Sequence, residues 1–364
     1  MTDIAENNLS LVTNLETSKQ DKKQKFSYSK LNTYENCPWR YKLTYVDQHF
    51  IQDASLAADF GTLCHYIEEQ IGNEFIKNQN IPYSEKINLI NFDYYINLFI
   101  DGNDEQIGIR AIKDKYGEKF NLTDKYNQTF TDKANNYLNI GLYMLNDLLV
   151  TNENIKIIGT EIPFSVEYKD YVFHGFIDRL LFDAASQTYI IQDLKTWANI
   201  DGHSLTTPLQ FVFYVQAVQN LYNVPINNIK CQYVLPLTGE TFDAGTSGFM
   251  KRGLTKIDKL LSKIEDKNFT PNPSPLCYFC VFSDTNPEQP EEGKNLCPYH
   301  SNWTRNKRDF SVNFEWAGLD NHEKIMESYI KNNNQNITLN VKPYTTCNNS
   351  KYIDLDRFLM LKRW

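Results

Sequence analysis

The sequence predicts an α/β fold, with a sheet at the centre and helices on either side. Residues 160–168, 172–182 and 189–196 have the alternating or β-branched apolar composition of strands and are separated by short turns. Apolar residues at helical spacing precede these strands at 59–69 and follow them at 208–222. Because short turns join antiparallel neighbours, we expect a three-stranded meander that helices cover.

The first strand illustrates how the pattern predicts burial. Apolar and polar residues alternate from Thr160 to Tyr168, so one face of this strand should be buried. A turn at Lys169 and Asp170 returns the chain into the second strand, and residues 184–188 return it into the third.

The elements that follow the meander are also readable. Thr207 and Pro208 supply a cap and a first-turn proline for a helix that Asn223 ends. Residues 229–235 are expected to form another strand, and residues 250–264 a closing amphipathic helix.

Charged residues within the strands indicate a metal site. Asp193 and Lys195 are two apart on a strand, so their side chains project the same way. Asp178 lies in an apolar run, where an unpaired carboxylate costs on the order of several kcal/mol or takes up a proton. A divalent cation held by Asp178 and Asp193 would compensate this charge, and Mg²⁺ or Mn²⁺ suits such hard oxygen ligands. Lys195 would then lie beside a metal-bound water.

Each of these features also has an ordinary structural interpretation. An acid and a lysine at this spacing often form a solvated surface pair, and Gln210 with Tyr214 can be a plain helix face. Three interpretations of Glu161 remain open: a metal ligand, a carboxylate behind the ligands, or a solvated strand residue.

The segment Gly175-Phe-Ile-Asp178, followed by Asp193-Leu-Lys195, resembles the PD-(D/E)XK nuclease superfamily. That superfamily carries a carboxylate on one strand and a D/E-x-K triplet on the next. The resemblance implies a restriction-endonuclease-like core with a central mixed sheet. It also implies metal-dependent hydrolysis of phosphodiester bonds.

Neighbouring motifs are similar to those of the RecB-like branch, which includes AddB-type and CRISPR-associated exonucleases. Gln210-Phe-Val-Phe-Tyr214 matches the Q-x-x-x-Y motif of this branch, and Gly61 with His65 matches its G-x-x-x-H motif. This resemblance implies an exonuclease acting on DNA in recombination, repair or phage DNA processing. The implied partners are DNA with single-stranded ends and recombination or replication proteins.

The resemblance assigns roles to individual residues. The implied ligands of Mg²⁺ or Mn²⁺ are His65, Asp178, Asp193 and the backbone carbonyl of Leu194, with Glu161 as a further candidate. Lys195 would orient or deprotonate the attacking water. Gln210 and Tyr214 would position the substrate backbone or Lys195.

The cysteines indicate a second metal centre. Seven cysteines are too few for a disulfide scaffold in 364 residues, and their grouping near the C-terminus favours metal ligation in a reducing, cytoplasmic setting. Cys277 and Cys280 form a C-x-x-C pair, Cys297 follows after a 16-residue gap, and Cys37 lies far upstream. The RecB-like branch holds a 4Fe-4S cluster with four such cysteines. The long gap keeps zinc open, bound by four thiolates or by three with His300.

The predicted organisation is a flexible tail (1–25), N-terminal helices with Cys37 and His65 (26–78), a helical insertion (79–150), a nuclease core (151–268), a cysteine clamp (269–300) and a C-terminal extension of unknown role (301–364). The insertion resembles one found in RecB-like exonucleases, and we expect it to cover the groove. Its aromatic residues either pack between helices or stack on unpaired bases.

Composition restricts the possible functions. A net charge of −8 is not typical of a nucleic-acid binder, although a nuclease can confine positive charge to one groove. We expect no signal peptide and no membrane span, since no apolar run approaches about 18 residues. The alternatives are a non-cleaving nucleic-acid-binding or recombination-complex module and a zinc-stabilised structural protein. The first would be expected to lack a metal ligand or the lysine, and this sequence retains them.

Overall fold

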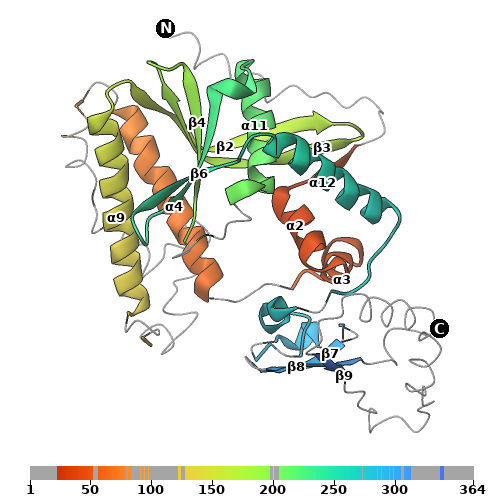
Figure 1. The fold of residues 1–364 in the computed structure, drawn as a ribbon. Coiled ribbons are helices and arrows are strands. Elements are labelled where there is room, and N and C mark those ends of the chain that lie inside the picture. Colours follow the sequence, from red (N-terminus) through yellow and green to blue (C-terminus); the bar gives the residue numbers. More distant parts are fainter. Residues whose placement is uncertain are drawn as a thin grey trace, which may run out of the picture.

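The computed structural model describes residues 23–51, 56–78, 81–82, 85, 91, 94, 97, 122–123, 128–196, 200, 205–272, 274–284, 286–287, 289–294, 296–297, 299–304, 307–312 and 337–339. Its main body is a mixed sheet between two layers of helices, with a smaller three-stranded sheet beside it (Figure 1).

Six strands form the central sheet, in the order β1-β3-β4-β5-β6, with β2 paired to β3. Their bounds are β1 (Gln24–Phe26), β2 (Ile155–Tyr168), β3 (Tyr171–Asp183), β4 (Thr188–Leu194), β5 (Ile229–Leu235) and β6 (Glu240–Ala244). The predicted meander is confirmed, because β2, β3 and β4 pair antiparallel in sequence order. β5 then pairs parallel to β4, which makes the sheet mixed.

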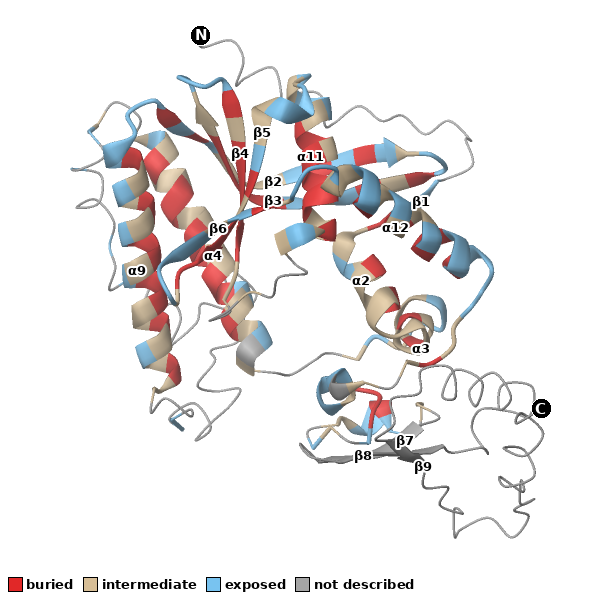
Figure 2. Ribbon diagram, in the orientation of Figure 1, coloured by how far each residue is buried: buried red, intermediate tan, exposed pale blue. Residues whose placement is uncertain are grey.

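Helices cover both faces of this sheet. One layer consists of α2 (Tyr28–Asn36), α11 (Leu209–Tyr222) and α12 (Phe249–Glu265), and the other of α4 (Leu56–Lys77) and α9 (Phe130–Thr151). Leu180 packs in the first layer and Leu181 in the second, as adjacent residues of a strand must. Both cores are closely filled, and Figure 2 shows buried stripes on the inward sides of α4, α9 and α11.

Local sequence explains where these helices begin and end. The Ser27 hydroxyl accepts a hydrogen bond from the Lys30 amide at 3.2 Å and so caps α2. Asn223 adopts a left-handed conformation after α11, which ends the helix where predicted. The expected Thr207 cap was wrong by one residue, since Pro208 occupies the cap position of α11.

The shorter elements join the first and last parts of the body. They are α3 (Pro38–Tyr41), a π-helical turn (Lys42–Val46), and the 3₁₀ turns η5 (Ile226–Asn228), η6 (Pro275–Phe279) and η7 (Glu291–Gly293). Trp39 Nε1 donates to the Leu296 carbonyl at 3.0 Å, and the Tyr34 hydroxyl to the Asn268 carbonyl at 2.5 Å. Residues more than 230 positions apart are therefore in direct contact.

Some segment boundaries differ from the prediction. Residues 24–26 form β1 beside β3, so they do not belong to a flexible tail. Most of the predicted insertion lies outside the described residues, apart from α9 and a few isolated positions. In the C-terminal extension, β7 (Tyr299–Thr304), β8 (Lys307–Val312) and β9 (Ile337–Leu339) form the smaller sheet. None of the helices in the described part of the chain is both long and apolar enough to cross a bilayer.

Candidate active site

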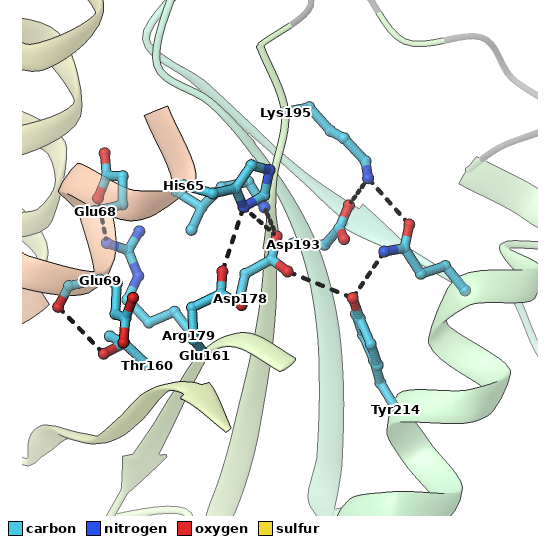
Figure 3. A network of polar contacts seen from close by, with 12 residues as sticks. His65, Glu68, Glu69, Thr160, Glu161, Asp178, Arg179, Asp193, Lys195 and Tyr214 are labelled. Carbon is cyan, nitrogen blue, oxygen red and sulfur yellow. Dashed lines mark hydrogen bonds and ion pairs between the residues drawn. The ribbon is translucent and has the colours of Figure 1, made fainter. Parts of the chain in front are cut away.

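A cluster of charged side chains lies where the pairing of β3 with β4 ends, between α4 and α11 (Figure 3). Arg179 pairs with Gln192 across these strands, and the same register places Asp178 opposite Asp193. Opposed residues of an antiparallel pair share a face, so the two carboxylates lie together. The meander thereby unites acidic residues that are 15 positions apart in the sequence.

Asp178 is a buried carboxylate held by two donors. Its Oδ2 accepts the Leu194 amide at 2.8 Å, and its Oδ1 accepts the Tyr214 hydroxyl at 3.4 Å. Burial and the neighbouring Asp193 raise the pKa of Asp178 to about 7, although His65 and Lys195 oppose this. The site therefore lacks sufficient positive charge for its carboxylates, which is the situation a bound cation corrects.

Asp193 has no exposed surface, and Lys195 Nζ lies 2.6 Å from its Oδ2. Lys195 Nζ is the partner of Asp193 Oδ2, whereas Oδ1 has no hydrogen-bond partner among the described residues. Burial lowers the pKa of Lys195, but the Asp193 and Asp178 carboxylates outweigh this and raise it above the ordinary value. Lys195 is thus a cation, and Asp193 keeps lone pairs for a further ligand.

Gln210 and Tyr214 connect Lys195 to Asp178 from one face of α11. Lys195 Nζ donates to Gln210 Oε1 at 3.0 Å, and Gln210 Nε2 donates to the Tyr214 hydroxyl at 2.7 Å. Burial, with the nearby Asp178, raises the pKa of Tyr214 well above its usual value, so Tyr214 remains a donor. The two residues form a bridge that fixes the lysine relative to the carboxylate.

His65 approaches the same carboxylate from α4. Its Nδ1 lies 3.5 Å from both Glu161 Oε1 and Asp178 Oδ2, and one ligand atom of each residue lies within 4.8 Å of the others. Burial lowers the pKa of His65, but the hydrogen bond to Glu161 and the nearby carboxylates raise it to about 9. A divalent cation would displace this proton, since only neutral imidazole ligates a metal. Asp193 is not one of these three grouped residues.

Glu161 has an unusual backbone for a strand residue, with a φ of +45°. The other described non-glycine residues with positive φ lie in turns, loops or helix ends. Such a conformation costs on the order of 1–3 kcal/mol and tends to occur at functional sites. The strained residue is the one whose carboxylate lies beside His65. This supports the interpretation of Glu161 as a metal ligand over its interpretation as a solvated strand residue.

The predicted carbonyl ligand is less well defined. The structure gives a contact for the Leu194 amide, which donates to Asp178, and the ligand role of its carbonyl stays a prediction. The Lys195 amide donates to the Val234 carbonyl at 2.9 Å, so pairing with β5 continues past the last residue of β4. This extension fixes the backbone from which the lysine projects.

Sequence reasoning missed a buried ion pair behind the site. Arg179 Nη1 donates to Glu68 Oε2 at 3.2 Å, and only 3% and 4% of the two side chains is exposed. Arg179 Nε also donates to Gln192 Oε1 at 2.8 Å. Arg179 lies in the same apolar run as Asp178, so the rule that a buried charge needs a partner applied to it equally.

These contacts continue across the sheet as a polar ladder, which comprises Glu68, Arg179, Gln192, Gln232 and Asp243. Successive strand members of the ladder are register partners in β3, β4, β5 and β6. Glu68 lies one turn after His65 on α4, and Arg179 directly follows Asp178 on β3. The ladder therefore joins the two elements that carry these candidate metal ligands.

The cysteines of the predicted clamp come from the contacting ends of the body. Cys37 Sγ accepts the Arg40 amide at 3.5 Å, and Cys277 Sγ accepts the Ser274 amide at 3.4 Å. Burial raises the pKa of Cys277 to about 12, and the nearby Cys37 and Cys280 add to this. Cys280 and Cys297 pack against one small apolar cluster, which also includes Trp39. The side chain of His300 lies outside the described part.

Thiol groups in this setting suit a soft metal centre. Backbone amides directed at sulfur are typical of ligating cysteines, and thiolates select zinc or iron–sulfur clusters. A metal would displace the proton of Cys277, as metal binding to cysteine always requires. The donor set therefore fits either centre, and the geometry of a cluster stays a prediction.

The family comparison agrees with this arrangement. The PD-(D/E)XK nuclease superfamily matches the chain over residues 25–285, well over half of its length. The matched region includes every residue of the candidate active site and three of the four clamp cysteines, and it ends before Cys297. No curated protein matches the chain.

Proposed function

Since the chain belongs to the PD-(D/E)XK nuclease superfamily, we propose that it is a Mg²⁺- or Mn²⁺-dependent DNA exonuclease of the RecB-like branch. The observation that supports this most is the bridge from Lys195 through Gln210 and Tyr214 to Asp178. A solvated surface pair would need no such bridge. The bridge instead fixes a charged amine beside two buried carboxylates.

The residues present fit a divalent cation. Asp193 is fully buried and its Oδ1 has no hydrogen-bond partner among the described residues, and the pKa of Asp178 is raised by burial. The residues that would hold the ion are His65, Glu161, Asp178 and Asp193, with the Leu194 carbonyl as a further oxygen. When bound, the ion lowers the pKa of a coordinated water and offsets charge on the scissile phosphate.

The protein groups then act on the water and the phosphate. Lys195 Nζ is protonated and is held by Gln210 Oε1, so it orients the attacking water and stabilises negative charge in the transition state. Tyr214 keeps Asp178 Oδ1 in place through its hydroxyl. Water attacks phosphorus and loses a proton to solvent, the bond to the 3′-oxygen breaks, and that oxygen takes up a proton from solvent. The products carry a 5′-phosphate and a 3′-hydroxyl.

The biological setting follows from the same proposal. We expect DNA with single-stranded ends as substrate, and recombination, repair or phage DNA processing, in a reducing cytoplasmic compartment, as the process. A non-cleaving nucleic-acid-binding module is disfavoured because Asp178, Asp193 and Lys195 are all present. Lys195 pairs with Asp193 and is linked to Asp178 through Gln210 and Tyr214.

The proposal predicts the products of a labelled-DNA assay. We expect release of short 5′-phosphorylated products from one end of 5′- or 3′-labelled DNA with Mn²⁺, and none with EDTA, because the carboxylates require a cation. Single-stranded and duplex substrates, run side by side, identify the preferred end. Internal fragments without end products would show that the protein is a nuclease, and would refute the proposed exonuclease activity. DNA binding without any cleavage would favour the non-cleaving module.

We further infer that Cys37, Cys277, Cys280 and Cys297 bind one metal centre, a 4Fe-4S cluster. The bonds from Trp39 to Leu296 and from Asn272 to Asn36 bring the two parts of the chain that carry them together. A cross-link over more than 230 residues stabilises a fold by about 5 kcal/mol in chain-entropy terms.

Replacing Cys37 by alanine is therefore expected to remove the brown colour of anaerobically purified protein and to lower its stability by about 5 kcal/mol. Visible absorbance, iron analysis and urea unfolding measure these effects. Cys231→Ala is the matched control, because Cys231 is buried in the sheet core and should leave the colour intact. Colourless protein with stoichiometric zinc would refute the iron–sulfur cluster, and protein without metal would refute the clamp.

A further inference from the structure

The outer side of α12 carries a concentration of positive charge on an otherwise acidic chain. Five lysine or arginine residues and two acidic residues lie within this helix, whereas the whole chain has a net charge of −8. Both acidic residues are engaged on the sheet side. Asp258 accepts from Tyr168 at 2.9 Å and from Lys169 at 2.6 Å, and Glu265 accepts from Tyr171. The exposed basic residues of α12 lie on its outer side and are Lys251, Arg252, Lys259 and Lys263.

A shallow groove follows this outer side. Its lining residues are Lys251, Arg252, Thr255, Lys256 and Lys259. All of them except the half-buried Lys256, which pairs with Glu35, are exposed. Figure 2 shows the exposed stripe along α12. Lys251 and Lys259 present exposed amines along this groove, and no carboxylate is among its lining residues. Arg252 donates to the Ser247 and Thr206 carbonyls, so its guanidinium fixes the start of the helix and adds positive charge beside the two lysines.

Close packing places α12 against α11, the helix that carries Gln210 and Tyr214 of the candidate active site. A Cβ on Gly253 would meet Val212 Cγ2 at 2.4 Å, so α12 crosses α11 at a point between Gln210 and Tyr214 in the sequence. Arg252 Nη2 donates to the Thr206 carbonyl at 3.1 Å and so holds the segment that enters α11. Packed helices have axes about 8–10 Å apart, so α12 lies one helix layer from the helix that carries Gln210 and Tyr214.

We propose that the outer side of α12 binds the phosphate backbone of the substrate strand a few nucleotides from the scissile bond. The choice of ligand rests on the proposed function. Exposed lysine amines on one side of a helix suit successive phosphodiesters and carry no information about base sequence. This surface would also explain how a chain of negative net charge holds DNA, because positive charge is concentrated on one helix that packs against α11.

The test is the salt dependence of DNA binding by the full-length protein, measured by fluorescence anisotropy in EDTA so that no cleavage occurs. The double variant Lys251→Ala/Lys259→Ala is expected to reduce the slope of log K against log salt by about 0.7–0.9 per lysine removed. Lys156→Ala is the matched control, since Lys156 is an exposed lysine on β2. In Mn²⁺, the double variant should lose more cleavage rate on long than on very short oligonucleotides.

The outcomes separate this proposal from the proposed function. An unchanged slope in the double variant, or an equal change in Lys156→Ala, would overturn the phosphate-binding role of α12. A reduced slope in a protein that cleaves no DNA would support the surface and refute the nuclease. Circular dichroism of each variant confirms that the comparison is between folded proteins.

Discussion

Lys195→Ala is expected to slow DNA cleavage by about two to four orders of magnitude while leaving the fold intact. Among the described residues, the lysine amine is the cation that pairs with Asp193, and Gln210 fixes its position. Its removal deletes the group that orients water and stabilises the transition state, but it removes little packing. Single-turnover cleavage at saturating Mn²⁺ measures the loss, and thermal melting measures the fold.

Two further variants make this result interpretable. Asp178→Asn should slow cleavage by a similar factor. It should cost the metal-free protein little stability, because the loss of one acceptor for the Leu194 amide or the Tyr214 hydroxyl is offset by removal of a carboxylate whose charged form burial opposes. Lys230→Ala, at an exposed position on β5, should cleave at the wild-type rate. Cleavage by Lys195→Ala at the wild-type rate would show that the Asp193-Leu-Lys195 triplet has been assigned wrongly.

The second large effect concerns the ladder. Replacing Arg179 by methionine, or Glu68 by leucine, is expected to lower the free energy of unfolding by about 3–5 kcal/mol, since each change leaves the partner charge buried and unpaired. The double variant should recover most of that stability, because an apolar pair of similar volume replaces the ion pair. Urea unfolding of the four proteins forms a double-mutant cycle.

Cation binding distinguishes a positioning role of the ladder from a purely structural one. His65 and Asp178 lie on the elements that Glu68 and Arg179 join, so the double variant should regain stability without regaining Mn²⁺ affinity in calorimetry. If the double variant regained both stability and Mn²⁺ affinity, the Glu68–Arg179 pair would only stabilise the fold. The exposed Lys23–Glu167 pair is the control, and its loss should cost less than about 1 kcal/mol.

The sheet was largely predictable because strand signals are local. Residues 229–235 form β5 with the bounds expected from their composition, and the meander follows from short turns. The start of β2 was predicted five residues late, at Thr160 and not Ile155. A register shift between Ile157 and Gly159 interrupts the alternation there, so the pattern of period two changes phase and hides the first part of the strand.

The candidate site was predictable only where spacing is short. Asp193 with Lys195, and Gln210 with Tyr214, are placed together by strand and helix geometry alone. The position of Glu161 depends on a left-handed backbone that no sequence pattern announces. The contact between Glu68 and Arg179 joins residues 111 positions apart, which requires the packing of α4 on the sheet to be known.

The contacts between the first helices and residues 268–296 also determine when folding can be completed during translation. Tyr34 leaves the ribosome 234 residues before Asn268, whose carbonyl it contacts, and synthesis of this interval takes about 10–50 s at typical rates. Throughout that time α2 lacks α12, and Cys37 lacks the three cysteines of the later segment. A nascent chain therefore contains its candidate catalytic residues before the contacts between its first helices and residues 268–296 can form. The complete fold forms only after nearly all of the region that matches the family has been synthesised.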